Sequence, residues 1–109
     1  MVLVVNDVGF QAEILDFKGV SFVDFWATWC GPCRIQGPII DSLAEKYSSE
    51  TSLKLAKLDV DENNETAMQY KVLSIPTIII FKDGKVMESL VGLRSETDLE
   101  EKIKYYLKG

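Results

Sequence analysis

The order of apolar and polar residues predicts an α/β fold, a three-layer α/β/α arrangement with a central mixed sheet of four to five strands flanked by four helices. Two observations carry this prediction. β-rich runs alternate with stretches of helical spacing in the order β-α-β-α-β-α-β-β-α, and the dipeptide Asp83-Gly84 separates the last two β-rich runs as a two-residue hairpin turn would. The 109 residues contain no linker and no repeat, so we expect a single domain over 1–109.

The first part of the chain predicts a strand, a helix and a second strand. Residues 2–5 are β-rich, and Asn6 and Asp7 then offer caps for a helix. The apolar side chains of that helix are Phe10, Ile14 and Phe17. Residues 20–26 are almost entirely apolar, which is typical of a central strand covered on both faces. Asp24 interrupts this run, so we expect its carboxyl group to be buried.

The segment that follows the two cysteines predicts a helix with a kink at Pro38, preceded by Gly37. Its apolar positions are Ile35, Ile39, Ile40, Leu43 and Tyr47. A strand over 53–60 comes next. Residues 61–64 supply caps for a short helix around 67–70.

The last part of the chain predicts two strands and a helix. Pro76 opens a strand over 77–82, and the hairpin turn makes the next strand, 85–91, antiparallel to it. Ser95 and Asp98 form a capping box for the final helix. The buried positions of that helix are Leu99, Ile103 and Leu107. Three right-handed crossovers are expected to make the first four strands parallel, so that the hairpin adds the antiparallel one.

Composition excludes several classes of function. Histidine is absent, which removes histidine-assisted hydrolysis, HExxH zinc sites and CxxCH haem attachment. With 17 acidic and 12 basic residues the net charge is −5, so neither a nucleic acid nor a membrane surface is an expected partner. The sequence also lacks a signal peptide and a long apolar span, and we expect a cytoplasmic protein.

The two cysteines carry the main chemical signal. Cys30 and Cys33 are three residues apart at a strand-to-helix junction, where open α/β sheets place their active sites. Such a pair can close into a disulfide or stay open as a dithiol. Cys30 lies at the helix N-terminus, which favours a thiolate and predicts a nucleophile, whereas Cys33, one turn inside and better shielded, predicts a resolving thiol. Gly31 allows a tight turn, and Pro32 suits the first helical turn.

Other interpretations of the same residues remain. A CxxC pair can be half of a zinc site, but tetrahedral zinc needs two more Cys or His ligands, which only a dimer could supply here. We therefore expect no metal. The cysteines could also be small buried residues or a static crosslink. By themselves, Trp26 and Trp29 are typical core or surface aromatics, and Lys57 is typical of a solvated strand lysine.

The chain resembles the thioredoxin family from Val2 to Leu107. The residues that carry the resemblance are the WCGPC motif at 29–33, Asp24 within VDFW, Lys57 within AKLD, the Ile75-Pro76-Thr77 segment, and Gly92 after the last strand. Two positions depart from the family pattern: Gly37 replaces the usual Ala before the helix proline, and Arg34 stands where Lys is common.

The resemblance implies a thioredoxin fold and a general protein dithiol–disulfide oxidoreductase. Such a protein reduces disulfides in other proteins, carries electrons in cell redox homeostasis, needs no bound cofactor and is recharged by a thioredoxin reductase. We expect a monomer. We also expect Asp24 to accept the proton of Cys33, because the chain has no histidine to do so. The family pattern places Lys57 near Asp24.

The resemblance further implies a substrate groove and a cis peptide bond. Pro76 is cis in the family and faces the active disulfide, although an X–Pro bond judged without the resemblance is more often trans. The implied groove is formed by Trp29, Gly31, Pro32, Val60, Ile75, Pro76, Val91 and Gly92. A disulfide-forming oxidant and a non-catalytic clamp remain alternatives, although Gly31-Pro32 between the cysteines favours the reducing branch.

Overall fold

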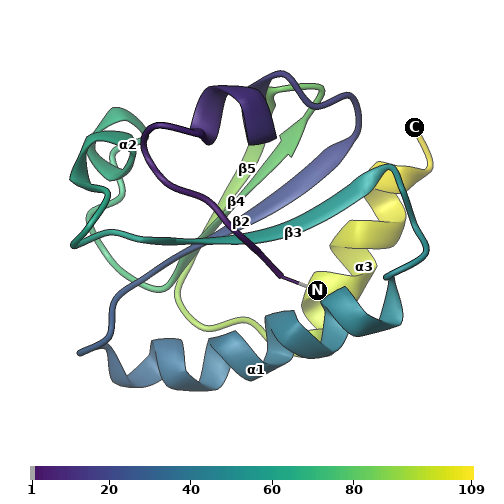
Figure 1. The fold of residues 1–109 in the computed structure, drawn as a ribbon. Coiled ribbons are helices and arrows are strands. Elements are labelled where there is room, and N and C mark those ends of the chain that lie inside the picture. The colour runs from purple at the N-terminus through teal and green to yellow at the C-terminus, as the bar shows by residue number, and fades with distance from the viewer. Residues whose placement is uncertain (1) are drawn as a thin grey trace.

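The computed structural model describes residues 2–109, which contain a five-stranded mixed sheet in the order β1-β3-β2-β4-β5 (Figure 1). The strands are β1 (Leu3–Val4), β2 (Val20–Trp26), β3 (Leu53–Asp59), β4 (Thr77–Lys82) and β5 (Lys85–Val91). The helices are the π-helix η1 (Gln11–Leu15) and the α-helices α1 (Gly31–Lys46), α2 (Asn64–Gln69) and α3 (Glu96–Leu107). The predicted fold class is confirmed. The predicted domain boundary at Met1 lies outside the described residues.

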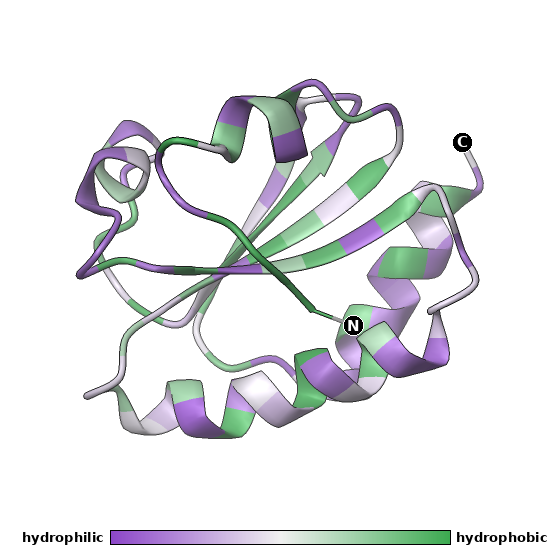
Figure 2. Ribbon diagram, in the orientation of Figure 1, coloured by the Kyte–Doolittle hydropathy of each residue, from purple (hydrophilic) through white to green (hydrophobic). Residues whose placement is uncertain are grey.

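The helices form two layers, with α1 and α3 on one face of the sheet and η1 and α2 on the other (Figure 1). Successive residues of a strand point to opposite faces. In β2, Phe22 therefore packs toward α1 and α3, and Val23 packs toward η1. Figure 2 shows the hydrophobic strands between helices of mixed character. By the same alternation, Asp24 and Trp26 lie on the α1 face.

The direction of β4 differs from the prediction. Strands β1 and β2 run parallel to β3, but β4 runs antiparallel to β2, so the predicted third parallel crossover is wrong. Six residues of α2 span about 9 Å, whereas a strand of seven residues spans about 23 Å. The helix alone therefore does not return the chain across the sheet, and Thr77 pairs with Phe25 near the end of β2, at the edge where β3 also ends. The β4–β5 hairpin is antiparallel as predicted.

The first helix is shorter than predicted. It is a π-helix of five residues, with the Asp16 N–H donating to Gln11 O at 2.8 Å. The two predicted caps serve other segments: Asn6 Oδ1 accepts from the Gly9 N–H at 2.8 Å in the turn before η1. Asp7 Oδ1 accepts from the Thr66 N–H at 2.9 Å, so it caps α2, 59 residues further along the chain. Of the predicted strands, 2–5 is reduced to β1, and 53–60 ends at Asp59.

The buried side of α1 shares only Ile40 and Leu43 with the predicted apolar stripe. It is formed by Cys33, Gln36, Ile40, Leu43 and Ala44. Ile35, which was predicted to lie in the stripe, is 56% exposed, so this prediction is wrong. Gln36 is buried next to it, while Ile39 and Tyr47 pack partly buried against the core. Pro38 lies inside the helix.

The last helix begins and packs largely as predicted. Ser95 Oγ accepts from the Asp98 N–H at 3.1 Å, which confirms the N-terminal cap. Leu99 and Ile103 are fully buried. The third buried side chain is Tyr106 rather than the predicted Leu107, which is only partly buried against the same core. No helix within residues 2–109 has the length and apolar character that crossing a membrane requires.

Candidate active site

The two cysteines lie where the chain leaves β2 and enters α1. Cys30 is the N-cap residue of α1, and its Sγ accepts the backbone N–H of Cys33 at 3.2 Å. Gly31 and Pro32 form the first turn, as predicted. The two cysteines are joined by a disulfide, with their Cα atoms 5.3 Å apart. The pair thus closes between neighbouring turns without help from any distant segment.

The disulfide is covered on both sulfurs. Cys30 is 4% exposed and Cys33 is 5% exposed, so the expectation that Cys33 is the better shielded of the two is wrong for the disulfide form. Both pack with Ala27, and the partly buried Val60 and Ile75 lie against them. Position at the helix end, rather than exposure, distinguishes the two cysteines.

Asp24 is buried beneath the dithiol helix, as the sequence predicts. It is 3% exposed, and its Oδ1 has no hydrogen-bond partner among residues 2–109. Burial raises the pKa of its carboxyl group from 3.8 to about 7; the charge of Lys57 reduces this rise, and the charge of Asp41 adds to it. Lys57 is the partner of Asp24 in the β2–β3 register, and its Nζ lies 5.3 Å from the centroid of the Trp26 ring.

A cavity of about 270 Å³ connects this carboxyl group with the dithiol. Asp24, Cys33, Lys57, Arg34 and Asp41 all line it. Cys33 and the buried carboxyl group therefore face a common space. A proton can pass between such groups directly or through one water molecule.

The remaining predicted residues lie around the disulfide. The Ile75–Pro76 bond is cis, as the resemblance implies. The Gly92 N–H donates to Pro76 O at 2.8 Å, and Gly92 has a φ of 93°, which favours glycine. Trp29 is 67% exposed and Val91 is 58% exposed. Among the predicted groove residues, Trp29 and Val91 expose apolar side chains, and a hydrogen bond joins the loops that carry Pro76 and Gly92.

Sequence reasoning missed three residues near this site. Asp61 Oδ2 accepts the indole N–H of Trp29 at 2.8 Å and so holds the exposed ring. Asp41 lines the cavity, and Gln36 is buried one turn beyond Cys33. Asp61 resembled an ordinary helix cap, and the other two resembled polar positions of an amphipathic helix. Only the assembled fold brings them to the site.

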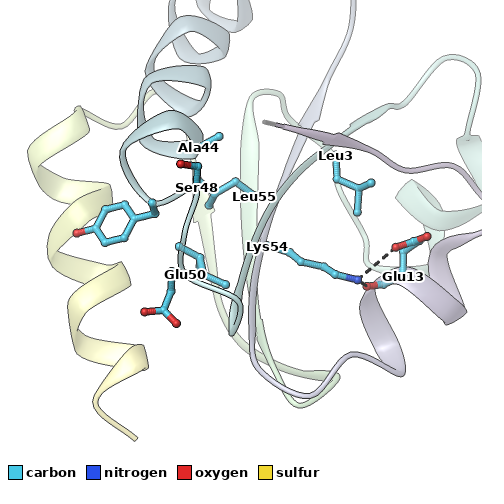
Figure 3. A pocket seen from close by; sticks show the side chains of 9 residues that line it. Leu3, Glu13, Ala44, Ser48, Glu50, Lys54 and Leu55 are labelled. Carbon is cyan, nitrogen blue, oxygen red and sulfur yellow. Dashed lines mark hydrogen bonds and ion pairs between the residues drawn. The ribbon is translucent and has the colours of Figure 1, made fainter.

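A second cavity lies away from the disulfide, beside the first residues of β3. It has a volume of about 240 Å³, and Figure 3 shows Lys54 paired there with Glu13. The Lys54 Nζ donates to the backbone O of Glu13 at 2.8 Å and contacts its carboxylate at 3.2 Å. Lys54 and Glu13 are therefore already paired with each other. Residues 2–109 also contain no cluster of three or more Cys, Asp or Glu side chains suited to a metal ion.

Comparison with known proteins agrees with this geometry. The family model described as Thioredoxin matches residues 1–105. The chain belongs to the thioredoxin family. The thioredoxin of Listeria monocytogenes serovar 1/2a is 43% identical over 107 residues, which cover 98% of this chain and 100% of the relative. The thioredoxin of Staphylococcus aureus strain Mu50 is 44% identical over 103 residues, covering 94% and 95%.

Membership in the thioredoxin family establishes the class of reaction. The chain is a dithiol–disulfide oxidoreductase of the protein-disulfide reductase type, and the Cys30–Cys33 pair fits the redox-active site of that family. Proteins that contain disulfides are the substrates of thioredoxins in general, and a reductase is their general partner. The five-stranded mixed sheet with flanking helices is consistent with the thioredoxin fold.

Proposed function

We propose that Cys30 is the nucleophile of this reductase and Cys33 its resolving thiol. In the reduced protein, the Cys30 thiolate attacks one sulfur of a substrate disulfide, and the other substrate sulfur leaves as a thiolate that takes up a proton. Cys33 then loses its proton and attacks Cys30 Sγ, which releases the second substrate thiol and closes the Cys30–Cys33 disulfide. Two electrons pass from the dithiol to the substrate.

One observation carries the assignment of Cys30. Its Sγ accepts the N–H of Cys33 at the N-terminus of α1, a helix of 16 residues. An N–H donor and the positive end of the helix dipole both favour the thiolate over the thiol. Cys33 lies one turn inside the helix and has no equivalent position. The first attack therefore falls to Cys30.

Asp24 is proposed as the acceptor of the Cys33 proton. A general base works best when its pKa lies near the working pH, and burial raises the pKa of Asp24 to about 7. Asp24 and Cys33 line the same cavity, which gives the proton a route between them, directly or through one water molecule. Lys57, the register partner of Asp24, modulates this carboxyl group by favouring its charged form.

The groove around the disulfide is proposed to hold an extended segment of a protein substrate. The exposed side chains of Trp29 and Val91 offer apolar contact area, and Ile75, before the cis bond to Pro76, packs with Val60 against the cysteines. Gly31, Pro32 and Gly92 leave room for close approach of the substrate backbone. The same surface would receive the thioredoxin reductase that restores the dithiol.

The wider setting is also part of the proposal. The protein acts as a cytoplasmic electron carrier, monomeric, and without a bound cofactor. Its net charge of −5 supports neither a nucleic-acid nor a membrane partner.

A trapping experiment tests the order of attack. The Cys33→Ser variant should accumulate stable mixed disulfides with insulin, because the resolving thiol is gone, while Cys30→Ser should accumulate few. Insulin reduction driven by dithiothreitol should proceed with the native chain and fall to background with Cys30→Ser. Equal trapping by the two variants would refute the assignment of Cys30.

A further inference from the structure

Gln36 is a buried amide placed one helical turn beyond Cys33. It is 0% exposed, and it occupies the side of α1 that faces the core. A primary amide costs free energy to bury unless its donor and acceptor are both paired. Both are paired here, and with a single residue: Gln36 Nε2 donates to Arg94 O at 3.1 Å, and Gln36 Oε1 accepts the Arg94 N–H at 2.8 Å.

Arg94 belongs to the short segment that joins β5 to α3. That segment begins with Gly92, whose N–H donates to Pro76 O at 2.8 Å, and it ends at Ser95, the cap of α3. Between these two points the backbone of Arg94 is bonded to the side chain of Gln36. The segment that carries Gly92 is thus tied to the cis loop by one bond and to the dithiol helix by two.

This arrangement connects the separate parts of the proposed groove. One wall is the segment from Val91 to Gly92, and the disulfide lies at the start of α1. Since Gln36 is on α1 and Arg94 is two residues beyond Gly92, the paired amide limits how far this wall can move from the two sulfurs. Val91 and Leu93, on either side of Gly92, are 58% and 46% exposed, so their side chains do not anchor the segment in the core.

We propose that Gln36 is a positioning residue for protein substrates, which holds the 92–94 segment at a fixed distance from the dithiol by bonding both backbone groups of Arg94. This inference rests on the proposed groove. A substrate segment in the groove needs contacts with the wall and with the sulfurs at the same time, whereas a small disulfide needs only the sulfurs. Loss of the paired amide should therefore affect protein substrates selectively.

The test compares two disulfide substrates in the full-length chain. Gln36→Met keeps the length of the side chain and removes both hydrogen bonds. The expected result is a rise of about tenfold in the KM for insulin, with kcat changed by less than about twofold. A tenfold change is the size expected when one hydrogen-bonded amide between partly buried groups is lost. The rate with 5,5′-dithiobis(2-nitrobenzoate) should stay within about twofold of the native rate, since this reagent needs no groove wall.

Leu43→Ala is the matched control for lost stability. Leu43 is fully buried in the same helix, in a core cluster that includes none of residues 92–94. This variant should unfold at lower urea concentration than the native chain and keep the native KM for insulin. If Gln36→Met and Leu43→Ala behave alike toward both substrates, Gln36 serves packing only and the proposal is wrong.

Gln36→Glu provides a second and independent readout. A protonated carboxyl group can donate to Arg94 O and accept from the Arg94 N–H, as the amide does, whereas the ionised group can only accept. Burial raises the pKa of such a carboxyl group. The insulin KM of this variant, divided by the native KM at the same pH, should therefore fall toward one as the pH is lowered from 8 to 5. A ratio independent of pH would contradict the proposal.

The same measurements separate this inference from the proposed function. If the native chain reduces 5,5′-dithiobis(2-nitrobenzoate) but not insulin, the proposed function fails, and the inference fails with it. If the native chain reduces both and Gln36→Met leaves the KM for insulin unchanged, the inference alone fails.

Discussion

The two faces of the sheet differ in what their cores contain at the end of β2. On the η1 and α2 face, the rings of Phe10, Tyr70 and Phe81 contact one another with centroids 5.4 to 5.7 Å apart. On the α1 and α3 face, the apolar core ends toward the carboxyl end of β2 at Asp24, whose Oδ1 has no partner within residues 2–109, and at a cavity of about 270 Å³. The first face serves stability, and the second combines stability with chemistry.

The boundary between apolar core and polar site follows strand position. On the α1 face of β2, Phe22 is packed in the core and the next residue on that face, Asp24, lines the cavity. On β3 the same change occurs between Leu55 and Lys57. On these two strands, the polar groups of the α1 face thus lie at the end of the sheet where α1 begins. A change on the aromatic face should therefore alter stability alone, and a change at this end should alter the reaction.

The largest expected loss of stability comes from the aromatic face. Phe81 is 1% exposed and makes edge contacts with Phe10 and Tyr70. Phe81→Ala should lower the free energy of unfolding by about 3–5 kcal/mol, because the substitution removes the ring contacts and leaves a cavity that cannot fully collapse. Urea unfolding measures this loss. Insulin reduction per folded molecule should stay native, and a changed rate would show that the two faces are not separate.

Two separate substitutions in the cavity beside Asp24 should move the pKa of Asp24 in opposite directions. The positive charge of Lys57 lowers this pKa and the negative charge of Asp41 raises it. Lys57→Met should raise the pKa of Asp24 by about one unit, as the loss of a nearby opposite charge does, and Asp41→Asn should lower it by less. Infrared titration of the buried carboxyl band measures both. Shifts of the same sign would contradict the charges assigned to the cavity.

A smaller effect is expected at the cap that Asp7 provides. Asp7 Oδ1 accepts from both the N–H and the hydroxyl of Thr66 at the start of α2. Asp7→Ala should lower the free energy of unfolding by about 1 kcal/mol, the usual cost of a lost N-cap. Asn6→Ala, which loses only a turn hydrogen bond to Gly9, is the matched control. Urea unfolding should find the smaller loss for Asn6→Ala, and an equal loss would refute the role of Asp7.

The sequence predicts most of the sheet because its signals are local. β2, β4 and β5 have the predicted bounds, since an apolar run and a two-residue turn at Asp83 and Gly84 need no distant partner. The direction of β4 was mispredicted because it depends on the edge of the sheet to which the connection after β3 leads, which the apolar pattern does not encode. The same limit applies to Asp7, whose helix lies 59 residues away.

In the candidate site, too, the features set by local sequence were predicted and those that depend on distant residues were not. The cysteine pair and the burial of Asp24 follow from spacing and from a carboxylate within an apolar run, and both are found in the structure. Gln36 could not be predicted, because a glutamine is expected on the solvent side of a helix. Its burial depends on Arg94, 58 residues further along the chain, and Ile35 is exposed beside it.

Ionisation of the buried Asp24 lowers the free energy of unfolding, because its pKa is higher in the folded than in the unfolded protein. A carboxyl group whose folded pKa is about 7 and whose unfolded pKa is near 4 imposes no cost below pH 4. The cost grows as the pH rises from 4 to 7 and then stays constant, at about 4 kcal/mol. Removal of this carboxyl group should therefore stabilise the protein at neutral and alkaline pH.

Urea unfolding of the oxidised native chain and of Asp24→Ala, from pH 4 to pH 9, tests this claim most directly. At pH 4 the variant should be less stable than the native chain only by the packing that the carboxyl group supplied. Above pH 7 it should be more stable by up to about 4 kcal/mol, reduced by the same loss of packing. Asp41→Asn, which removes an exposed carboxylate at the same cavity, should show only a small part of this gain. A variant that is less stable than the native chain at pH 8, or a difference that does not change with pH, would contradict the account.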